Sequence, residues 1–214
     1  MSTRSDDDNR RLAPFNPTHE SSIDVAIHLL QLQPSDLLFD LGCGDGRMII
    51  RAASRVDGLR CVGIELDESL VARGRDMVIA KTSADKAALS DRVEIRNGDV
   101  LAEMKMIGQT PSPPPPPPPP PQPENDKGVL AESKLTLLDD ATAVFVYLLP
   151  QGLKKVKVLI EEAAKRRRLR WGLSDAQQQP ALRVCSYMFS IPGLAPVQVD
   201  RSGKGSCPIY LYHL

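Results

Sequence analysis

A glycine-rich segment stands directly after a short apolar run, and this arrangement constrains the fold more than any other feature. Leu37-Leu38-Phe39 is bounded by turn residues, as expected of a strand buried on both faces of a sheet, and Asp40-Leu41-Gly42-Cys43-Gly44-Asp45-Gly46 follows it. The amphipathic stretch through Met48–Ser54 predicts a helix after the loop. A strand, a glycine-rich turn and a helix in this order indicate an α/β fold that binds a ligand at the end of the strand.

Predicted strands and helices alternate along the rest of the chain. Apolar runs predict further strands, and helical spacing of apolar residues predicts the helices; the strand segments are 61–64, 93–95, 143–147 and 182–189, and the helices run from about 21 to 33, from 68 and from 152. Ser21 or Ser22 is expected to cap the first helix, and Asp67 a later one. Residues 197–199 and 209–212, joined by a turn containing glycine, predict a closing hairpin. This alternation favours a mostly parallel sheet with helices on both faces.

A proline-rich segment interrupts the pattern. It includes nine consecutive prolines from Pro113 to Pro121, which neither a helix nor a sheet accommodates and which prefer an extended polyproline II conformation. We expect residues 1–13 to be disordered and residues 14–214 to form one domain, interrupted by a disordered insertion at about 105–133. The proline run is either low-complexity sequence without function or a docking segment for a proline-recognising module of the SH3, WW or profilin type.

Charge and cysteine content exclude several classes of function. Lys and Arg total 27 against 27 Asp and Glu, so the chain has no net charge to attract nucleic acid or an acidic membrane. Its four cysteines form no CxxC pair and no Cys/His cluster, which argues against a metal site and a disulfide framework. The basic segment 165–170 is either a solvated helix end or a contact for phosphates or nuclear import.

We find no pattern of a targeting signal or of a membrane span in the sequence. The longest apolar stretch, 143–149, is far shorter than the roughly 20 residues of a membrane span. The acidic, polar first ten residues resemble neither a secretory signal nor a transit peptide. We expect a soluble, cytoplasmic monomer, with a mitochondrial or nuclear location as the alternatives.

Acidic residues at three strand ends indicate an adenosine-shaped site. The third glycine of Gly42-Cys43-Gly44-Asp45-Gly46 follows the second by two residues, whereas the dinucleotide fingerprint has three. Asp40 suits a cofactor ammonium group and disfavours a diphosphate. Glu65, 19 residues after Gly46, can accept from both ribose hydroxyls. Asp99, followed by Val100, can accept from the adenine amine. The pattern favours S-adenosylmethionine over a dinucleotide.

The motifs DLGCGDGR, GIELD and NGDV resemble those of class I S-adenosylmethionine-dependent methyltransferases, in register over roughly residues 35–150. The resemblance implies a Rossmann-like seven-stranded sheet, mostly parallel with the last strand antiparallel, and S-adenosylmethionine as cofactor. The cofactor-binding residues it implies are Asp40, Gly42, Gly44, Asp45, Gly46, Glu65, Asp99 and Val100.

Two further segments resemble a prokaryotic and mitochondrial-type branch that includes protein-lysine methyltransferases. They are Pro14-Phe15-Asn16-Pro17-Thr18 and the run ending in Tyr147-Leu148-Leu149-Pro150. The resemblance implies that Pro17 and Thr18 cover the site and that Tyr147 and Pro150 lie on the substrate side, with Tyr147 the catalytic candidate. Alternatively, Tyr147 only packs against its neighbours at the strand end, and Pro150 only begins the next helix, where proline is favoured. The chain departs from the mitochondrial members by lacking their hydrophobic N-terminal segment and by carrying the proline insertion.

The expected reaction is methyl transfer to a protein lysine by in-line displacement. The alternatives are a methyltransferase of a small molecule or RNA, and a cofactor-binding adaptor without catalysis. Methylases of adenine or glutamine amino groups carry Asp/Asn-Pro-Pro-aromatic after the fourth strand. Tyr147-Leu148-Leu149-Pro150 does not match this pattern, which disfavours those substrates. Methylation at cytosine C5 needs a nucleophilic cysteine at the same strand end, and it is disfavoured because the nearest cysteine in sequence, Cys185, lies within the predicted fifth strand.

Overall fold

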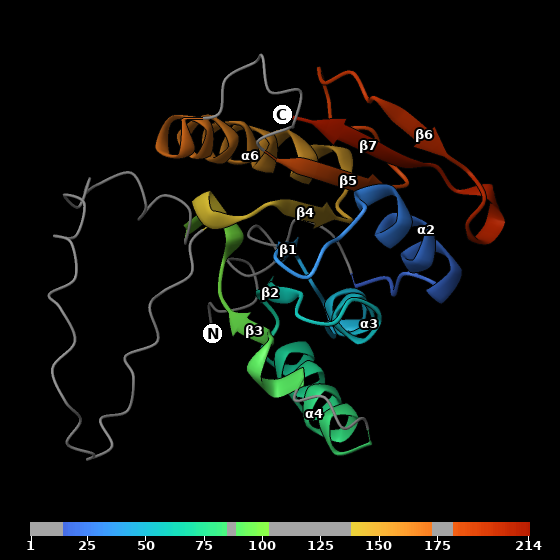
Figure 1. Ribbon diagram of the computed structural model, residues 1–214. Helices are drawn as coiled ribbons and strands as arrows, with labels where there is room; N and C mark the ends of the chain where they lie inside the picture. The colour runs from blue at the N-terminus through green and yellow to red at the C-terminus, as the bar shows by residue number, and fades with distance from the viewer. Residues whose placement is uncertain (1–14, 85–88, 103–137, 173–181) are drawn as a thin grey trace, which may run out of the picture.

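The computed structural model describes residues 15–84, 89–102, 138–172 and 182–214 (Figure 1). The predicted disordered N-terminus, 1–13, and the predicted insertion at 105–133 with Pro113–Pro121 lie outside the described residues. In the described ranges no helix is long and apolar enough to cross a membrane. Among those same residues, no cluster of His, Cys, Asp and Glu is arranged to hold a metal ion.

The strands form one seven-stranded sheet in the order β3-β2-β1-β4-β5-β7-β6. Strands β1 to β5 run parallel, and β7 is antiparallel to both β5 and β6. The strands are β1 Leu37–Leu41, β2 Arg60–Glu65, β3 Val93–Asn97, β4 Ala143–Val146, β5 Arg183–Tyr187, β6 Gln198–Asp200 and β7 Ile209–His213. This confirms the expected α/β class, with the last strand antiparallel and a closing hairpin made by β6 and β7.

Helices cover both faces of the sheet, as expected (Figure 1). One face carries α2 Glu20–Leu30, α3 Arg47–Arg55 and α4 Glu68–Ala84, and the other carries α6 Pro150–Trp171. Short 3-10 turns lie at Leu89–Asp91, Leu138–Asp140 and Lys204–Ser206.

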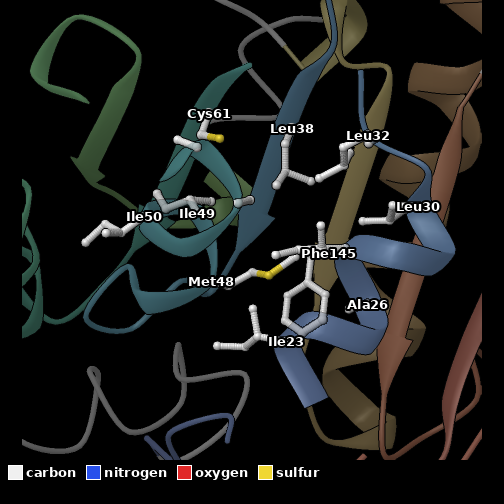
Figure 2. Packing of buried hydrophobic residues seen from close by; sticks show 14 of the residues in the cluster. Ile23, Ala26, Leu30, Leu32, Leu38, Met48, Ile49, Ile50, Cys61 and Phe145 are labelled. Carbon is white, nitrogen blue, oxygen red and sulfur yellow. The ribbon is translucent and has the colours of Figure 1, made fainter. Parts of the chain in front are cut away.

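Alternation along the strands supplies a core to each face. In β1, Leu38 packs with α2 and α3, while Leu37, Phe39 and Leu41 pack on the α6 side. Figure 2 shows the first of these cores, where Ile23 and Ala26 of α2 and Met48 of α3 gather around Phe145 of β4. Burial on both faces explains why these strands are continuous apolar runs rather than alternating ones.

The start of α2 differs from the predicted one. The helix runs from Glu20 to Leu30, and His19 is its N-cap, with the ring Nδ1 accepting from the Ser21 backbone N–H at 3.3 Å. The prediction of a serine cap was therefore wrong. Ser22 is buried inside the helix, where its hydroxyl donates to Tyr187 and accepts from the Lys204 backbone N–H. The Asp67 cap is confirmed, because its carboxylate accepts from the backbone N–H groups of Ser69 and Leu70.

Parallel pairing brings the candidate residues to one edge. Asp40 and Leu41 at the end of β1 lie in register with Gly63 and Ile64 of β2 and with Phe145 and Val146 of β4. The ends of β1, β2, β3 and β4 therefore meet at the same edge of the sheet, where open α/β sheets bind their ligands.

Candidate functional site

A cavity of about 270 Å³ lies at this edge of the sheet. Its walls come from the glycine loop after β1, the end of β2 and the residues that follow β3. Phe145 of β4, residues 147–149 after this strand and residues 188–189 after β5 complete these walls. The segment 15–18, which precedes α2, forms a further part of the lining. Segments far apart in the chain thus surround one pocket.

The pocket brings most of the predicted site residues together. Those that line it are Pro17, Thr18, Asp40, Gly42, Gly44, Asp45, Glu65, Asp99, Val100 and Tyr147. Gly46 and Pro150 do not line it. Gly46 is the N-cap of α3 with φ +73, and a Cβ there would come within 2.6 Å of Ile95 Cδ1, so the fold requires a glycine at this position. Pro150 is exposed and is the first residue of α6, a position that favours proline.

The glycine loop is held in place by Glu65. The backbone N–H of Gly44 donates to Oε2 of Glu65 at 2.8 Å, and the Asp67 N–H donates to Oε1 at 2.9 Å. Gly44 has φ +57, and a Cβ there would lie 2.6 Å from the Phe15 ring. Glycine is required here by the left-handed backbone and by the close approach of Phe15. The loop and the segment 15–18 are therefore packed against each other beside the pocket.

Asp40 is a buried carboxylate, only 3% exposed, at the end of β1. Burial raises the pKa of its carboxyl well above the ordinary value, and the nearby charges of Glu65 and Asp45 raise it further. Neither a hydrogen bond nor a cation among the described residues offsets these effects at Asp40. A cation entering the pocket would relieve this cost.

Asp45 is paired within the protein. Its carboxylate is buried and accepts from Arg47 Nε at 2.9 Å and Nη2 at 2.7 Å, and Arg73 lies 3.6 Å away. Burial alone would raise the pKa of Asp45, but the hydrogen bonds and charge of Arg47 outweigh burial and lower it. Asp45 is thus ionised and holds two arginines.

Tyr147 lies just after β4 in a network that links three segments. Its hydroxyl accepts from Asn16 Nδ2 at 2.8 Å and donates to Met188 Sδ at 2.9 Å. Its ring meets the ring of Tyr187 edge to face, with centroids 4.8 Å apart. Burial raises the pKa of Tyr147, so the phenol is neutral at physiological pH.

Comparison with known proteins shows similarity to methyltransferases. No protein-family model matches the chain. A protein-lysine N-methyltransferase of Saccharolobus islandicus (strain REY15A) is 24% identical over 201 residues, which cover 93% of this chain and 92% of the relative. The crystal structure of an RNA methyltransferase from Salinibacter ruber, in complex with S-adenosyl-L-homocysteine, has a TM-score of 0.61 at 27% identity and covers 92% of this chain and 93% of its own. This chain has the fold and cofactor type of class I S-adenosylmethionine-dependent methyltransferases.

A more distant structure agrees on the fold. An O-methyltransferase from Bacillus cereus in complex with S-adenosylhomocysteine has a TM-score of 0.51 at 14% identity, covering 86% of this chain and 63% of that chain. The side chains that line the pocket of this methyltransferase suit a cationic nucleoside. Its lining carries Asp40, Asp45, Glu65, Asp67 and Asp99 against a single cation in the described residues, Arg47.

The basic segment 165–170 of the methyltransferase lies at the C-terminal end of α6, whereas the pocket is beside the start of that helix. About 15 residues of helix separate Pro150 from this segment, which is roughly 22 Å at 1.5 Å per residue. Arg166 pairs with Asp139 at 2.8 Å and Arg170 with Asp140 at 2.9 Å. The arginines that pair in this way stabilise the packing of α6 against the turn before β4.

Several pocket residues of the methyltransferase were missed by sequence reasoning. Phe15 and Asn16 stand next to Pro17, and Arg47 follows the glycine loop, so their positions along the chain carried a usable signal. Met188 and Phe189 carried none, since they follow β5 in a turn in which Met188 has φ +66. Only tertiary structure brings that turn to the pocket.

Proposed function

We propose that this methyltransferase transfers the methyl group of S-adenosylmethionine to the side-chain nitrogen of a protein lysine. The observation that carries the proposal is the acceptor side of the pocket, where Tyr147, Met188 and Phe189 present apolar surface and one hydroxyl. The described lining holds no cation there to meet the phosphates of a nucleic acid, since its single guanidinium, Arg47, lies at the glycine loop. The similarity to the Saccharolobus islandicus protein, which bears the name of a protein-lysine methyltransferase, supports the same acceptor.

We assign the cofactor to the strand ends. Glu65 accepts from the ribose hydroxyls, since each of its oxygens receives one backbone hydrogen bond and keeps a further lone pair. Asp99 accepts from the adenine amine, with Val100 against the ring, and Asp40 accepts from the ammonium group of the amino-acid end. Gly42 and Gly44 allow the loop to lie close to it. When bound, the cofactor supplies an electrophilic methyl group on positively charged sulfur.

The acceptor side is apolar with one oriented hydroxyl. Tyr147, Met188 and Phe189 line the pocket together with Phe15, which suits the alkyl stem of lysine. The Tyr147 oxygen accepts from Asn16 and donates its proton to Met188, which leaves one lone pair to orient an amine N–H.

The reaction in this geometry is an in-line displacement. The lysine amine must be neutral, and burial beside a positive charge lowers the pKa of its ammonium, so the proton leaves to solvent before transfer. The nitrogen then forms a bond to the methyl carbon as the carbon–sulfur bond breaks, and that electron pair stays on sulfur. We assign Pro17 and Thr18, which line the pocket, to the exclusion of water, and the protein contributes orientation and desolvation.

RNA is the second candidate, because the Salinibacter ruber protein bears the name of an RNA methyltransferase. The basic side chains that would contact RNA gather at 165–170, away from the pocket, where Arg166 and Arg170 pair with acidic residues. This arrangement favours lysine over RNA.

The test is methyl transfer from radiolabelled S-adenosylmethionine to a cell lysate separated into protein, RNA and small-molecule fractions. We expect label in protein, resistant to ribonuclease and absent with the matched variant Glu65→Ala. Label that ribonuclease releases, or label in small molecules, would replace the lysine proposal by the corresponding alternative. Calorimetric binding of S-adenosylhomocysteine without transfer to any fraction would indicate an adaptor.

A further inference from the structure

Arg47 is the cation of the pocket that the proposed function leaves without a role. It is the first residue of α3, its side chain is 31% exposed, and it is the single cationic residue among the described residues that line the pocket. Sequence reasoning did not select it. Its position directly after the glycine loop places a guanidinium in the wall of the pocket.

The charge of the proposed cofactor creates a need for such a residue. Its amino-acid end carries an ammonium and a carboxylate, and Asp40 suits the first. The carboxylate of the cofactor, however, would lie in a pocket whose lining already carries five acidic residues, Asp40, Asp45, Glu65, Asp67 and Asp99. Unpaired like charges at close range cost binding free energy, so a carboxylate in this pocket requires a cationic partner.

The geometry of Arg47 leaves it able to meet that need. Asp45 accepts from Nε at 2.9 Å and from Nη2 at 2.7 Å, which fixes the plane of the guanidinium through two parallel hydrogen bonds. Nη1 has no acceptor among the residues that the structure describes. A guanidinium carries five N–H donors, so Arg47 keeps free donors on an oriented edge.

Two neighbours make this end of the pocket more positive. Arg73 lies 3.6 Å from the same Asp45 carboxylate, so two arginines share one negative charge. Gly46, the N-cap of α3, provides no side-chain acceptor, and the backbone N–H of Arg47 donates to Asp45 Oδ1 at 3.4 Å, so the first turn contributes the positive end of the helix dipole beside Arg47.

We propose that Arg47 binds the carboxylate of the cofactor's amino-acid end and that Asp45 is the positioning residue that orients it. This inference rests on the assignment of S-adenosylmethionine in the proposed function. It changes the expected role of Asp45 from a direct cofactor ligand to a residue that acts through Arg47.

The test compares two ligands that differ only in the carboxylate. Isothermal titration calorimetry measures S-adenosylhomocysteine and its decarboxylated analogue, which keeps the amine, on the wild type and on Arg47→Met. We expect Arg47→Met to weaken S-adenosylhomocysteine by about tenfold to a hundredfold and to change the affinity of the analogue less than about threefold. Equal losses for both ligands, or no loss for either, would overturn the inference.

Two further variants control for structural damage. Arg47→Met leaves Asp45 buried without its main partner, so Asp45→Asn/Arg47→Met removes both charges and must show the same ligand-dependent loss. Arg51→Met is the matched control on the same helix, because Arg51 pairs with Asp24 and Glu20 and does not line the pocket. It should change neither affinity. A wild type that binds neither ligand would overturn the cofactor assignment instead, so the two failures are distinguishable.

Discussion

Asn16 donates a hydrogen bond to the hydroxyl of Tyr147, 131 positions later in the chain, at 2.8 Å. The bond joins the segment before α2 to the residue after β4, and both of its residues line the pocket. The hydroxyl proton goes to Met188, so one lone pair of the Tyr147 oxygen remains, which in the proposed function orients the acceptor amine. We therefore expect Asn16 to matter for transfer more than for cofactor binding.

Asn16→Ala should lower the rate of methyl transfer about fivefold, the effect of one neutral hydrogen bond, with cofactor affinity changed less than about twofold. Tyr147→Phe should lower the rate at least as much. The double variant should be no slower than Tyr147→Phe, because both substitutions remove the same interaction. Initial rates of label incorporation into lysate protein measure this. Losses that simply add would contradict the coupling.

Gly44→Ala should weaken cofactor binding. Alanine at φ +57 costs about 1–2 kcal/mol, and its Cβ would displace the Phe15 ring that now approaches to 2.6 Å. Gly172→Ala is the matched control, because Gly172 has φ +60 with nothing within 4 Å of its Cβ position. Both variants should lose stability in thermal unfolding because of the positive φ, Gly44→Ala the more because its Cβ also meets Phe15, and calorimetry with S-adenosylhomocysteine should show a loss for Gly44→Ala alone. The same affinity in both variants would count against the close fit of the loop and Phe15.

Asp40→Asn should stabilise the cofactor-free protein and weaken its cofactor binding. Burial raises the pKa of the Asp40 carboxyl above its ordinary 3.8, so the folded state binds this proton more tightly than the unfolded state. This contribution to stability is fully present below pH 3.8 and is lost as pH rises through the raised pKa. At pH 8 the variant should therefore unfold a few degrees above the wild type.

The same substitution removes the charge that we assign to the cofactor's ammonium group. S-adenosylhomocysteine should bind Asp40→Asn about tenfold more weakly, and wild-type affinity should rise with pH as Asp40 ionises. Thermal unfolding with and without S-adenosylhomocysteine from pH 5 to pH 9 tests both effects. A variant that is less stable without ligand, or that binds as tightly as the wild type, would refute this role of Asp40.

Arg183→Met should destabilise the fold and leave the pocket unchanged. Arg183 pairs with the buried Asp36 at the amino end of the sheet, and its Nη1 donates to the carbonyls of Leu30 at 2.7 Å and Gln31 at 3.0 Å. Removing the arginine leaves a buried carboxylate unpaired, a loss of about 3 kcal/mol in the free energy of unfolding. Urea denaturation measures it, and Asp36→Asn in the same chain should restore part of the loss. A folded variant with altered affinity for S-adenosylhomocysteine would show that the two ends are coupled.

Local patterns in the sequence predicted much of the fold and part of the site. The run before Asp40, the glycine loop and the apolar spacing of α6 are features of a few consecutive residues, so periodicity reveals them. Parallel pairing then places strand ends together, which is why Asp40, Glu65 and Asp99 line one pocket.

Contacts between distant residues could not be predicted in the same way. Asn16 meets Tyr147, and Tyr147 meets Met188, only because the folded sheet brings three segments together. The cap of α2 was predicted wrongly from local sequence, since the Ser22 hydroxyl instead donates to Tyr187 and accepts from the Lys204 backbone N–H. A serine hydroxyl can bond either to the backbone at a helix start or to a distant group, and the tertiary contacts of Ser22 favoured the distant groups.

The most direct test of the proposed function is mass spectrometry of the residue that the purified protein modifies. A lysate is incubated with the protein and deuterium-methyl S-adenosylmethionine, and Glu65→Ala provides the control reaction. We predict deuterated methyl groups on lysine side chains of protein, present with the wild type and absent with the control. Deuterated methyl groups found only on RNA nucleosides or small metabolites, or no wild-type label at all, would contradict it.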